Sequence, residues 1–339
     1  YEISLGLVGS EMCIRDRSKC PRECFVEGEE ILPLFPGPYF GMEDIRGKLG
    51  VEDRPLIEIV IKPRTGLTET GLRRLIEKII NAKIKEEAWV DVIRDDQALF
   101  NPSYLSIKER IRIVKSLLEK NGLSDNTLYY VNLPVEPYLL RNATRKVIEW
   151  GADGIMINAI NNLSSIRILR ILNDENDKKF VIQSHMYGES VFTKNERFLV
   201  APSFFSKLCR YLGSDEVHVG GSGERYLVSP FEIKTLFEIL TKPHYRIKKS
   251  LPMVSGGLNL KSIYYLFKHN IISKDVAFGI GGFVYKHASI NVGIEKTIRV
   301  LRELIENLIE GKDPAELMRR DKLSPEFRIL SEHYKINWA

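Results

Sequence analysis

The sequence lacks the features that would tie the chain to a membrane or to nucleic acid. No apolar run approaches the ~20 residues that a membrane-spanning helix needs, so we expect no membrane partner. There is also no block of basic residues and no alternation of basic with aromatic residues. The net charge of +5 over 339 residues is mild. We therefore expect no nucleic-acid partner either.

Cysteine is scarce as well, with only four residues in the chain. Cys20 and Cys24 lie close together, but no second pair of cysteines or histidines follows at a spacing that binds zinc. The pattern favours reduced thiols in a cytoplasmic protein.

The first residues do not read as natural protein sequence. Residues 1–17, YEISLGLVGSEMCIRDR, look like read-through from a sequencing adaptor, and they lack the order of charge, apolar core and small residues that marks a signal peptide. We exclude residues 1–17 from the fold prediction as an artefact, and we expect the natural chain to begin further upstream.

Eight short apolar runs, each followed by a segment with helical periodicity, are the main structural signal. They are nearly continuous in apolar residues, as parallel strands buried on both faces are. An even repeat of eight strand–helix units predicts an α/β fold, a closed (β/α)8 TIM barrel over residues 46–312, with residues 313–339 as a helical extension. An open, doubly wound sheet is the alternative. The runs cover residues 56–62, 89–93, 128–133, 154–158, 180–184, 216–220, 252–255 and 276–280.

Polar residues stand where these predicted strands end, which is where such barrels carry their active sites. Lys62, followed by Pro63, would be a partly desolvated lysine able to act as a base, or else the partner of Asp95 or Asp96 in an ion pair. Arg225, in the loop GGSGER, could close over an anionic substrate or simply be solvated. The polar residues at the ends of the first six predicted strands are Lys62, Arg94, Asp96, Gln97, Asn132, Asn158, His185 and His218.

The two histidines and two glycine-rich turns complete the predicted site. A single histidine at a strand end is more often a hydrogen-bonded core residue than a catalytic one, but two at the same barrel end make a functional role and a structural role about equal. Glycine-rich turns after the seventh and eighth strands let backbone N–H groups approach a phosphate, although they could merely turn the chain. The phosphate-binding candidates are Ser255, Gly256, Gly257, Gly281 and Gly282.

Several motifs, in this order, resemble the RuBisCO large-chain superfamily. They are GPYFGMEDIRGKLGVEDRPL (37–56), IKPRTGLT (61–68), VDVIRDDQ (90–97), SGGL (255–258) and GIGGFVYKH (279–287). The resemblance implies a barrel preceded by an α+β domain, whose end and linker we place at residues 18–45. It also implies a homodimer or higher homo-oligomer in which that domain completes the partner's site.

The departures from the family pattern shape the predicted chemistry. In the carboxylases, a lysine on the second strand is carbamylated by CO₂ and binds Mg²⁺ together with an aspartate and a glutamate; here those positions are Arg94, Asp96 and Gln97. Arginine stays protonated and cannot form that carbamate, and glutamine is a poorer ligand for Mg²⁺. We therefore expect a degenerate metal site, with no cofactor required or Mg²⁺ weakly bound at Asp96. Arg94 would replace the cation and stabilise an enediolate, with Asp96 holding it in position.

Three further positions differ in the same direction. Arg64 replaces the second lysine of the first-strand motif, Arg225 aligns with the mobile-loop lysine, and Met186 replaces an arginine that binds the second substrate phosphate. The resemblance thus implies a RuBisCO-like enzyme, a lyase or isomerase, acting on a sugar derivative with a single phosphate. The alternatives are a true carboxylase with an altered site and a non-catalytic protein that binds a sugar phosphate.

Overall fold

The chain folds into a closed barrel of eight parallel strands, in which each strand pairs with the next and β8 pairs with β1. The computed structural model describes residues 35–63, 68–99, 104–194, 199–221, 229–244, 246–336 and 338. The predicted (β/α)8 barrel is confirmed, and the open sheet is ruled out. The strands are β1 (Leu56–Ile61), β2 (Val92–Asp95), β3 (Leu128–Asn132), β4 (Gly154–Asn158), β5 (Val181–His185), β6 (Glu216–His218), β7 (Leu251–Ser255) and β8 (Ala277–Ile280).

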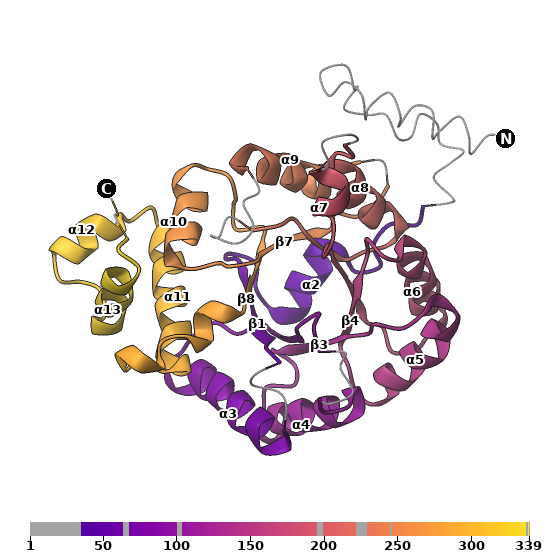
Figure 1. Ribbon diagram of the computed structural model, residues 1–339, viewed down its shortest axis with the longest axis horizontal. Coiled ribbons are helices and arrows are strands. Elements are labelled where there is room, and N and C mark those ends of the chain that lie inside the picture. Colours follow the sequence, from indigo (N-terminus) through magenta and orange to yellow (C-terminus); the bar gives the residue numbers. More distant parts are fainter. Residues whose placement is uncertain are drawn as a thin grey trace.

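Helices surround the strands on the outside (Figure 1). Their starts are set by local sequence: the Thr68 side chain accepts the N–H of Gly71, and Ser106 and Glu109 form a reciprocal capping box. The outer helices are α3 (Glu69–Lys85), α4 (Ile107–Lys120), α5 (Pro137–Glu149), α6 (Leu163–Glu175), α8 (Pro202–Leu212), α9 (Pro230–Thr241), α10 (Leu260–Lys268) and α11 (Ile294–Ile309). Among the described residues no helix is both long and apolar enough to cross a membrane.

Side chains alternate along the strands between two separate apolar cores. The outward-facing residues pack beneath the helices in one large core. Inward-facing residues near the starts of the strands form a smaller core with helix α2 (Gly41–Leu49), which lies within the ring of strands in Figure 1. The inward strand residues of this core are Leu56, Val92, Leu128, Tyr130, Val181, Leu251, Met253 and Ala277. Helix α2 therefore closes one end of the barrel, and the predicted site residues stand at the other end.

Helix α2 is held there by a buried carboxylate. Asp215 accepts hydrogen bonds from the backbone N–H groups of Phe40 and Gly41, at 2.7 and 3.0 Å. Gly41 has φ +71°, and a Cβ there would lie 2.7 Å from the carbonyl oxygen of Lys249. The border that we predicted between residues 45 and 46 falls inside this helix, because the linker supplies the plug of the barrel.

The start of strand β2 differs from the prediction, and helices after the eighth repeat extend the barrel. Strand β2 begins at Val92 rather than residue 89; just before it, the carboxylate of Asp91 accepts the N–H of Ile57, and the backbone carbonyl of Asp91 accepts the N–H of Leu128. At the other end of the chain, α12 (Pro314–Arg319) and α13 (Pro325–His333) pack against α11. A short helix α7 (Ser190–Thr193) and two 3₁₀ turns, η2 (Gly282–Tyr285) and η3 (Ala288–Ile290), lie in the loops after β5 and β8.

Candidate active site

The open end of the barrel brings most of the predicted residues together. Lys62 forms an ion pair with Asp96, linking the ends of β1 and β2. A Cβ at Gly281 would lie 2.5 Å from Cε of Lys62, so the lysine side chain crosses the turn after β8 at a point where only glycine fits. Asn132 donates from its side chain to the backbone carbonyl of Gln97, at 3.0 Å, and so braces the loop after β2.

The two histidines lie against each other on the next part of the rim. Their ring centroids are 4.1 Å apart, and Nδ1 of His218 lies 2.9 Å from Oγ of Ser255. Nδ1 of His185 accepts the backbone N–H of Tyr187, which places the ring proton of a neutral His185 on Nε2. The site therefore contains a lysine–aspartate pair and a histidine–histidine–serine cluster.

Both histidines are neutral at pH 7. Burial is the main cause that lowers the pKa of His185 far below its usual value, and the positive charges of Arg94 and Lys62 lower it further while Asp96 opposes them. Burial, His185 and Arg94 likewise hold the pKa of His218 well below its usual range. Neutral imidazoles can accept or donate a hydrogen bond, so either ring can assist a proton transfer.

The structure corrects the predicted partner of Arg94. We expected Asp96 to hold the guanidinium, but Asp96 pairs with Lys62, and Nε of Arg94 lies 3.0 Å from Oε2 of Glu58. Arg94 is only 2% exposed and extends into the barrel interior. Sequence analysis overlooked Glu58, although a single acid within the apolar strand LIEIVI is the kind of residue that needs a buried cation.

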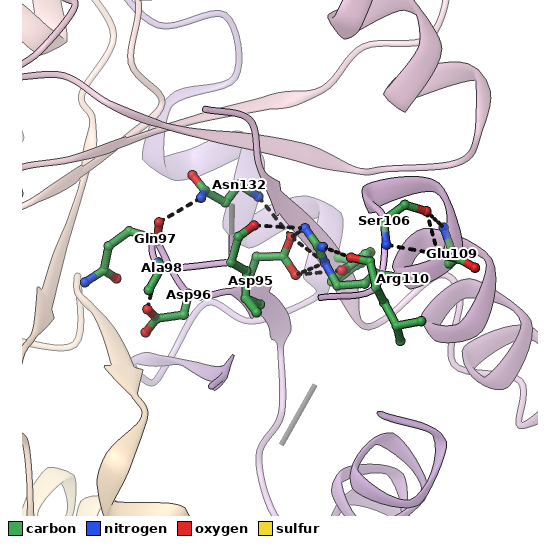
Figure 2. A network of polar contacts seen from close by, with 11 residues as sticks. Asp95, Asp96, Gln97, Ala98, Ser106, Glu109, Arg110 and Asn132 are labelled. Atoms are coloured by element: carbon green, nitrogen blue, oxygen red, sulfur yellow. Dashed lines mark hydrogen bonds and ion pairs between the residues drawn. The ribbon is translucent and has the colours of Figure 1, made fainter. Parts of the chain in front are cut away.

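Asp95, which follows Arg94 in the sequence, has its partners in the layer of helices and strands outside the barrel interior, and these contacts stabilise the fold. It forms an ion pair with Arg110 of α4, with Nη2 2.8 Å from Oδ2, and accepts a hydrogen bond from the Tyr129 hydroxyl, also at 2.8 Å. Figure 2 shows the carboxylates of Asp95 and Asp96 pointing in different directions. The charges of Arg94, Asp95 and Asp96 thus belong to three separate contacts: the barrel interior, the helix layer and the open end.

These residues do not fit a carbamate–Mg²⁺ centre. Arg94 cannot be carbamylated and has Glu58 as its partner, while Asp96 is engaged by Lys62. Gln97 offers a neutral amide, which is a weak ligand for a hard cation. Within the described ranges, no group of three or more His, Cys, Asp or Glu side chains is arranged to hold a metal ion.

The glycine-rich turns have local structural reasons as well as room for a ligand. Gly256 and Gly257 have φ of +98° and +71°, a conformation that favours glycine. Gly282 begins the 3₁₀ turn η2. The phosphate-binding role of Ser255, Gly256, Gly257, Gly281 and Gly282 stays a prediction.

Three further residues were singled out by the sequence, and two of them lie outside the described residues. Arg64 and Arg225 fall in segments 64–67 and 222–228, outside the described residues. Met186 is 7% exposed and belongs to the core beneath the helices. A cavity of about 1050 Å³ lies beside α2, lined partly by Tyr39 and Lys48, and contains none of the predicted site residues. The candidate site lies at the other end of the barrel from this cavity.

Fold and site together define a (β/α)8 barrel with a polar cluster at the carboxyl ends of its strands, where barrel enzymes carry their active sites. The family described as "Ribulose bisphosphate carboxylase large chain, catalytic domain" matches residues 41–334. The chain belongs to this family, and the predicted membership of the RuBisCO superfamily is confirmed.

Named relatives of this chain differ in activity. A ribulose bisphosphate carboxylase of Pyrococcus horikoshii is 27% identical over 305 residues, covering 88% of this chain and 66% of the relative. A 2,3-diketo-5-methylthiopentyl-1-phosphate enolase of Bacillus mycoides is 26% identical over 289 residues, covering 84% of this chain and 66% of the relative. A ribulose bisphosphate carboxylase-like protein of Archaeoglobus fulgidus is 29% identical over 290 residues, covering 84% and 62%.

A solved structure agrees with the fold. The octameric carboxylase of Pyrococcus horikoshii superposes with a TM-score of 0.79 at 24% identity, covering 91% of this chain and 72% of that one. The chain spans between 62% and 66% of the length of the three relatives above. Because relatives at similar identity include a carboxylase and an enolase, family membership alone does not assign the reaction.

Proposed function

We propose that this barrel belongs to a RuBisCO-like enzyme that enolises a phosphorylated sugar derivative, and so isomerises or decarboxylates it, without a carbamylated lysine and Mg²⁺. The observation that carries the proposal is the set of partners after the second strand. Asp96 pairs with Lys62, and Arg94 pairs with Glu58. The residues that would bind the metal are therefore committed to other charges. Two positive side chains supply the charge that the metal would otherwise provide.

Lys62 is the residue that we assign to moving the proton next to a carbonyl group. A substrate that covers the Lys62–Asp96 pair removes water from it, which favours proton transfer from the ammonium to the carboxylate. The resulting amine takes the proton from the carbon beside the carbonyl, and the electron pair of that C–H bond moves to the carbonyl oxygen as the enediolate forms. His185 or His218, both neutral, assists through hydrogen bonds. Arg94 contributes its positive charge from the barrel interior beneath the site.

The substrate is expected to carry one phosphate. Support comes from the glycine-rich turns at Ser255–Gly257 and Gly281–Gly282, which follow β7 and β8 beside the site, and from Met186, whose apolar side chain is buried and cannot bind an anion. The name of the Bacillus mycoides relative describes a substrate of this kind, a ketone with a single phosphate.

Exchange of substrate hydrogen with solvent deuterium tests the proposal. The panel contains ketose monophosphates and ketose bisphosphates. We expect the natural protein to catalyse the incorporation of deuterium from solvent into at least one monophosphate, because enolisation breaks a C–H bond reversibly. Mass spectrometry of the recovered substrate measures the exchange. Binding of these compounds without any exchange would contradict the proposal and favour a non-catalytic sugar-phosphate-binding protein.

A true carboxylase is the second candidate, favoured by the names of relatives such as the Pyrococcus horikoshii enzyme. Carboxylation of ribulose bisphosphate after incubation with CO₂ and Mg²⁺ would establish it. We expect none, because Arg94 cannot form the carbamate on which that activation depends.

We also propose a second copy of the chain as partner, covering the open end. Large apolar side chains are exposed at the starts of α5 and α9 and on or just before α7, the helices that follow β3, β6 and β5, and exposed apolar patches mark association surfaces. They include Tyr138 (80% exposed), Tyr187, Val191 (63%) and Phe231 (78%). Sedimentation of the natural protein should show a dimer or larger assembly, and replacing Tyr138 and Phe231 by serine should weaken it. A monomer at micromolar concentration would contradict the proposal.

A further inference from the structure

One layer below the site, the barrel interior carries charge where such barrels usually pack bulky apolar side chains. Glu58, Gln183 and Glu216 are fully buried and Arg94 nearly so. Arg94, Gln183 and Glu216 each stand two residues before a site residue on the same strand, Asp96, His185 and His218 respectively. An apolar floor formed with α2 lies beneath them. The charged layer is thus enclosed between that floor and the site.

Within this layer Arg94 has one carboxylate partner. Its Nε lies 3.0 Å from Oε2 of Glu58, although the N–H does not point at that oxygen. The side-chain amide of Gln183 donates to the same oxygen at 3.1 Å. Glu58 is therefore held by contacts from two other strands, β2 and β5.

The other end of the guanidinium is enclosed by uncharged atoms. Nη1 lies 3.3 Å from the sulfur of Met156, and Nη2 lies 3.9 Å from that of Met253. A Cβ at Gly279 would lie 2.7 Å from Nη2, so the guanidinium occupies space that any other residue there would fill. The position of the charge is accordingly set by packing as well as by the ion pair.

Charge balance in the layer depends on Glu216. Neither of its carboxyl oxygens accepts a hydrogen bond from the part of the chain that the structure describes. Burial, and then the adjacent Glu58, raise the pKa of Glu216 well above its usual value, which favours its neutral form. With Glu216 neutral, Glu58 is the carboxylate that balances the positive charge of Arg94.

We propose that Glu58 is a positioning residue that holds the Arg94 guanidinium inside the barrel, one layer beneath His185 and His218, and that this fixed charge adds to burial in disfavouring a proton on either imidazole. Arginine suits this role because it does not lose its proton in proteins. The titratable and charged side chains around the histidines and the layer are Glu58 and Lys62 on or after β1, Arg94 and Asp96 on or after β2, Tyr130 on β3, and Glu216 on β6. The inference rests on the proposed function only in treating the histidines as part of an active site.

Histidine titration by NMR tests the inference without a substrate. The double variant Glu58→Gln/Arg94→Met removes both charges together, so no unpaired charge is left buried. We expect the pKa values of His185 and His218 to rise in this variant, because the positive charge of Arg94 lowers both of them and the variant removes it. His185→Asn and His218→Asn variants assign the two signals among the six histidines.

Two single variants separate positioning from general disturbance of the core. Glu216→Gln is the matched control: it alters a buried glutamate of the same layer whose neutral form is already favoured, and should leave both titrations unchanged. Glu58→Gln leaves the Arg94 charge in place but removes the carboxylate that fixes it, so the histidine pKa values should stay low, while the guanidinium resonances of Arg94 should broaden or split as the side chain takes more than one position. Unchanged histidine pKa values in the double variant, or unchanged Arg94 resonances in Glu58→Gln, would overturn the inference. Because the titration uses no substrate, an error in the proposed reaction would leave its result intact.

Discussion

Replacing Asp95 by alanine should lower the free energy of unfolding by about 3–5 kcal/mol, the cost of leaving a buried charge without its partner. Asp95 is fully buried, and its carboxylate receives both the Arg110 guanidinium and the Tyr129 hydroxyl. Arg110 is itself 2% exposed, so the variant leaves a guanidinium in the helix layer with no carboxylate.

Urea unfolding followed by circular dichroism measures this change. Glu69→Ala is the matched control, since Glu69 pairs with Arg73 on the exposed face of α3 and such surface pairs contribute about 1 kcal/mol or less. An Asp95→Leu/Arg110→Met variant should recover much of the loss, because it removes both buried charges. The account of Asp95 would be wrong if Asp95→Ala cost no more than Glu69→Ala.

Replacing Lys62 by alanine should reduce deuterium exchange into the substrate by about 1,000-fold, within the range that a positioned acid–base group contributes. Lys62 is the amine beside Asp96, and its loss leaves the carboxylate without the group that moves the proton. Binding of a phosphorylated ligand should stay within about tenfold, because the predicted phosphate contacts come from the turns after β7 and β8.

The control for this variant is Lys108→Ala, a change to an exposed lysine of α4 that lies over Trp150 on the outside of the barrel. The Lys108→Ala variant should catalyse deuterium exchange into the substrate at the same rate as the unaltered protein. A Lys62→Ala protein that keeps full exchange activity would remove Lys62 from the mechanism, and one that no longer binds ligand would instead assign it to binding.

The sequence predicts the barrel well because strands buried on both faces leave a clear pattern of continuous apolar runs. It places strand ends less well, as at β2. There, the run WVDVI predicts a start at residue 89, but the strand begins at Val92, and just before it the Asp91 carboxylate accepts the N–H of Ile57. The sequence alone assigns residues 41–45 of helix α2 to the linker, because the role of this helix depends on contacts with inward-facing residues of several distant strands.

For single residues of the site, too, the sequence predicts the direction of a side chain better than its partner. Alternation along β2 predicts that Arg94 and Asp96 face the same way, and both do face the barrel axis. It does not reveal which residue of another strand each one meets, because that depends on the stagger of the strands around the barrel. Glu58 and Lys62 lie on the same strand four residues apart, and the deeper one pairs with Arg94 while the upper one pairs with Asp96.

The most direct test of the central claim is the rate of deuterium exchange into a monophosphate substrate with Mg²⁺ and with the metal removed by EDTA. The account predicts equal rates, within about twofold, because Arg94 and Lys62 supply the positive charge at the enediolate. Exchange that requires Mg²⁺ would contradict it, and would mean that a metal binds near Asp96 despite the ion pair with Lys62.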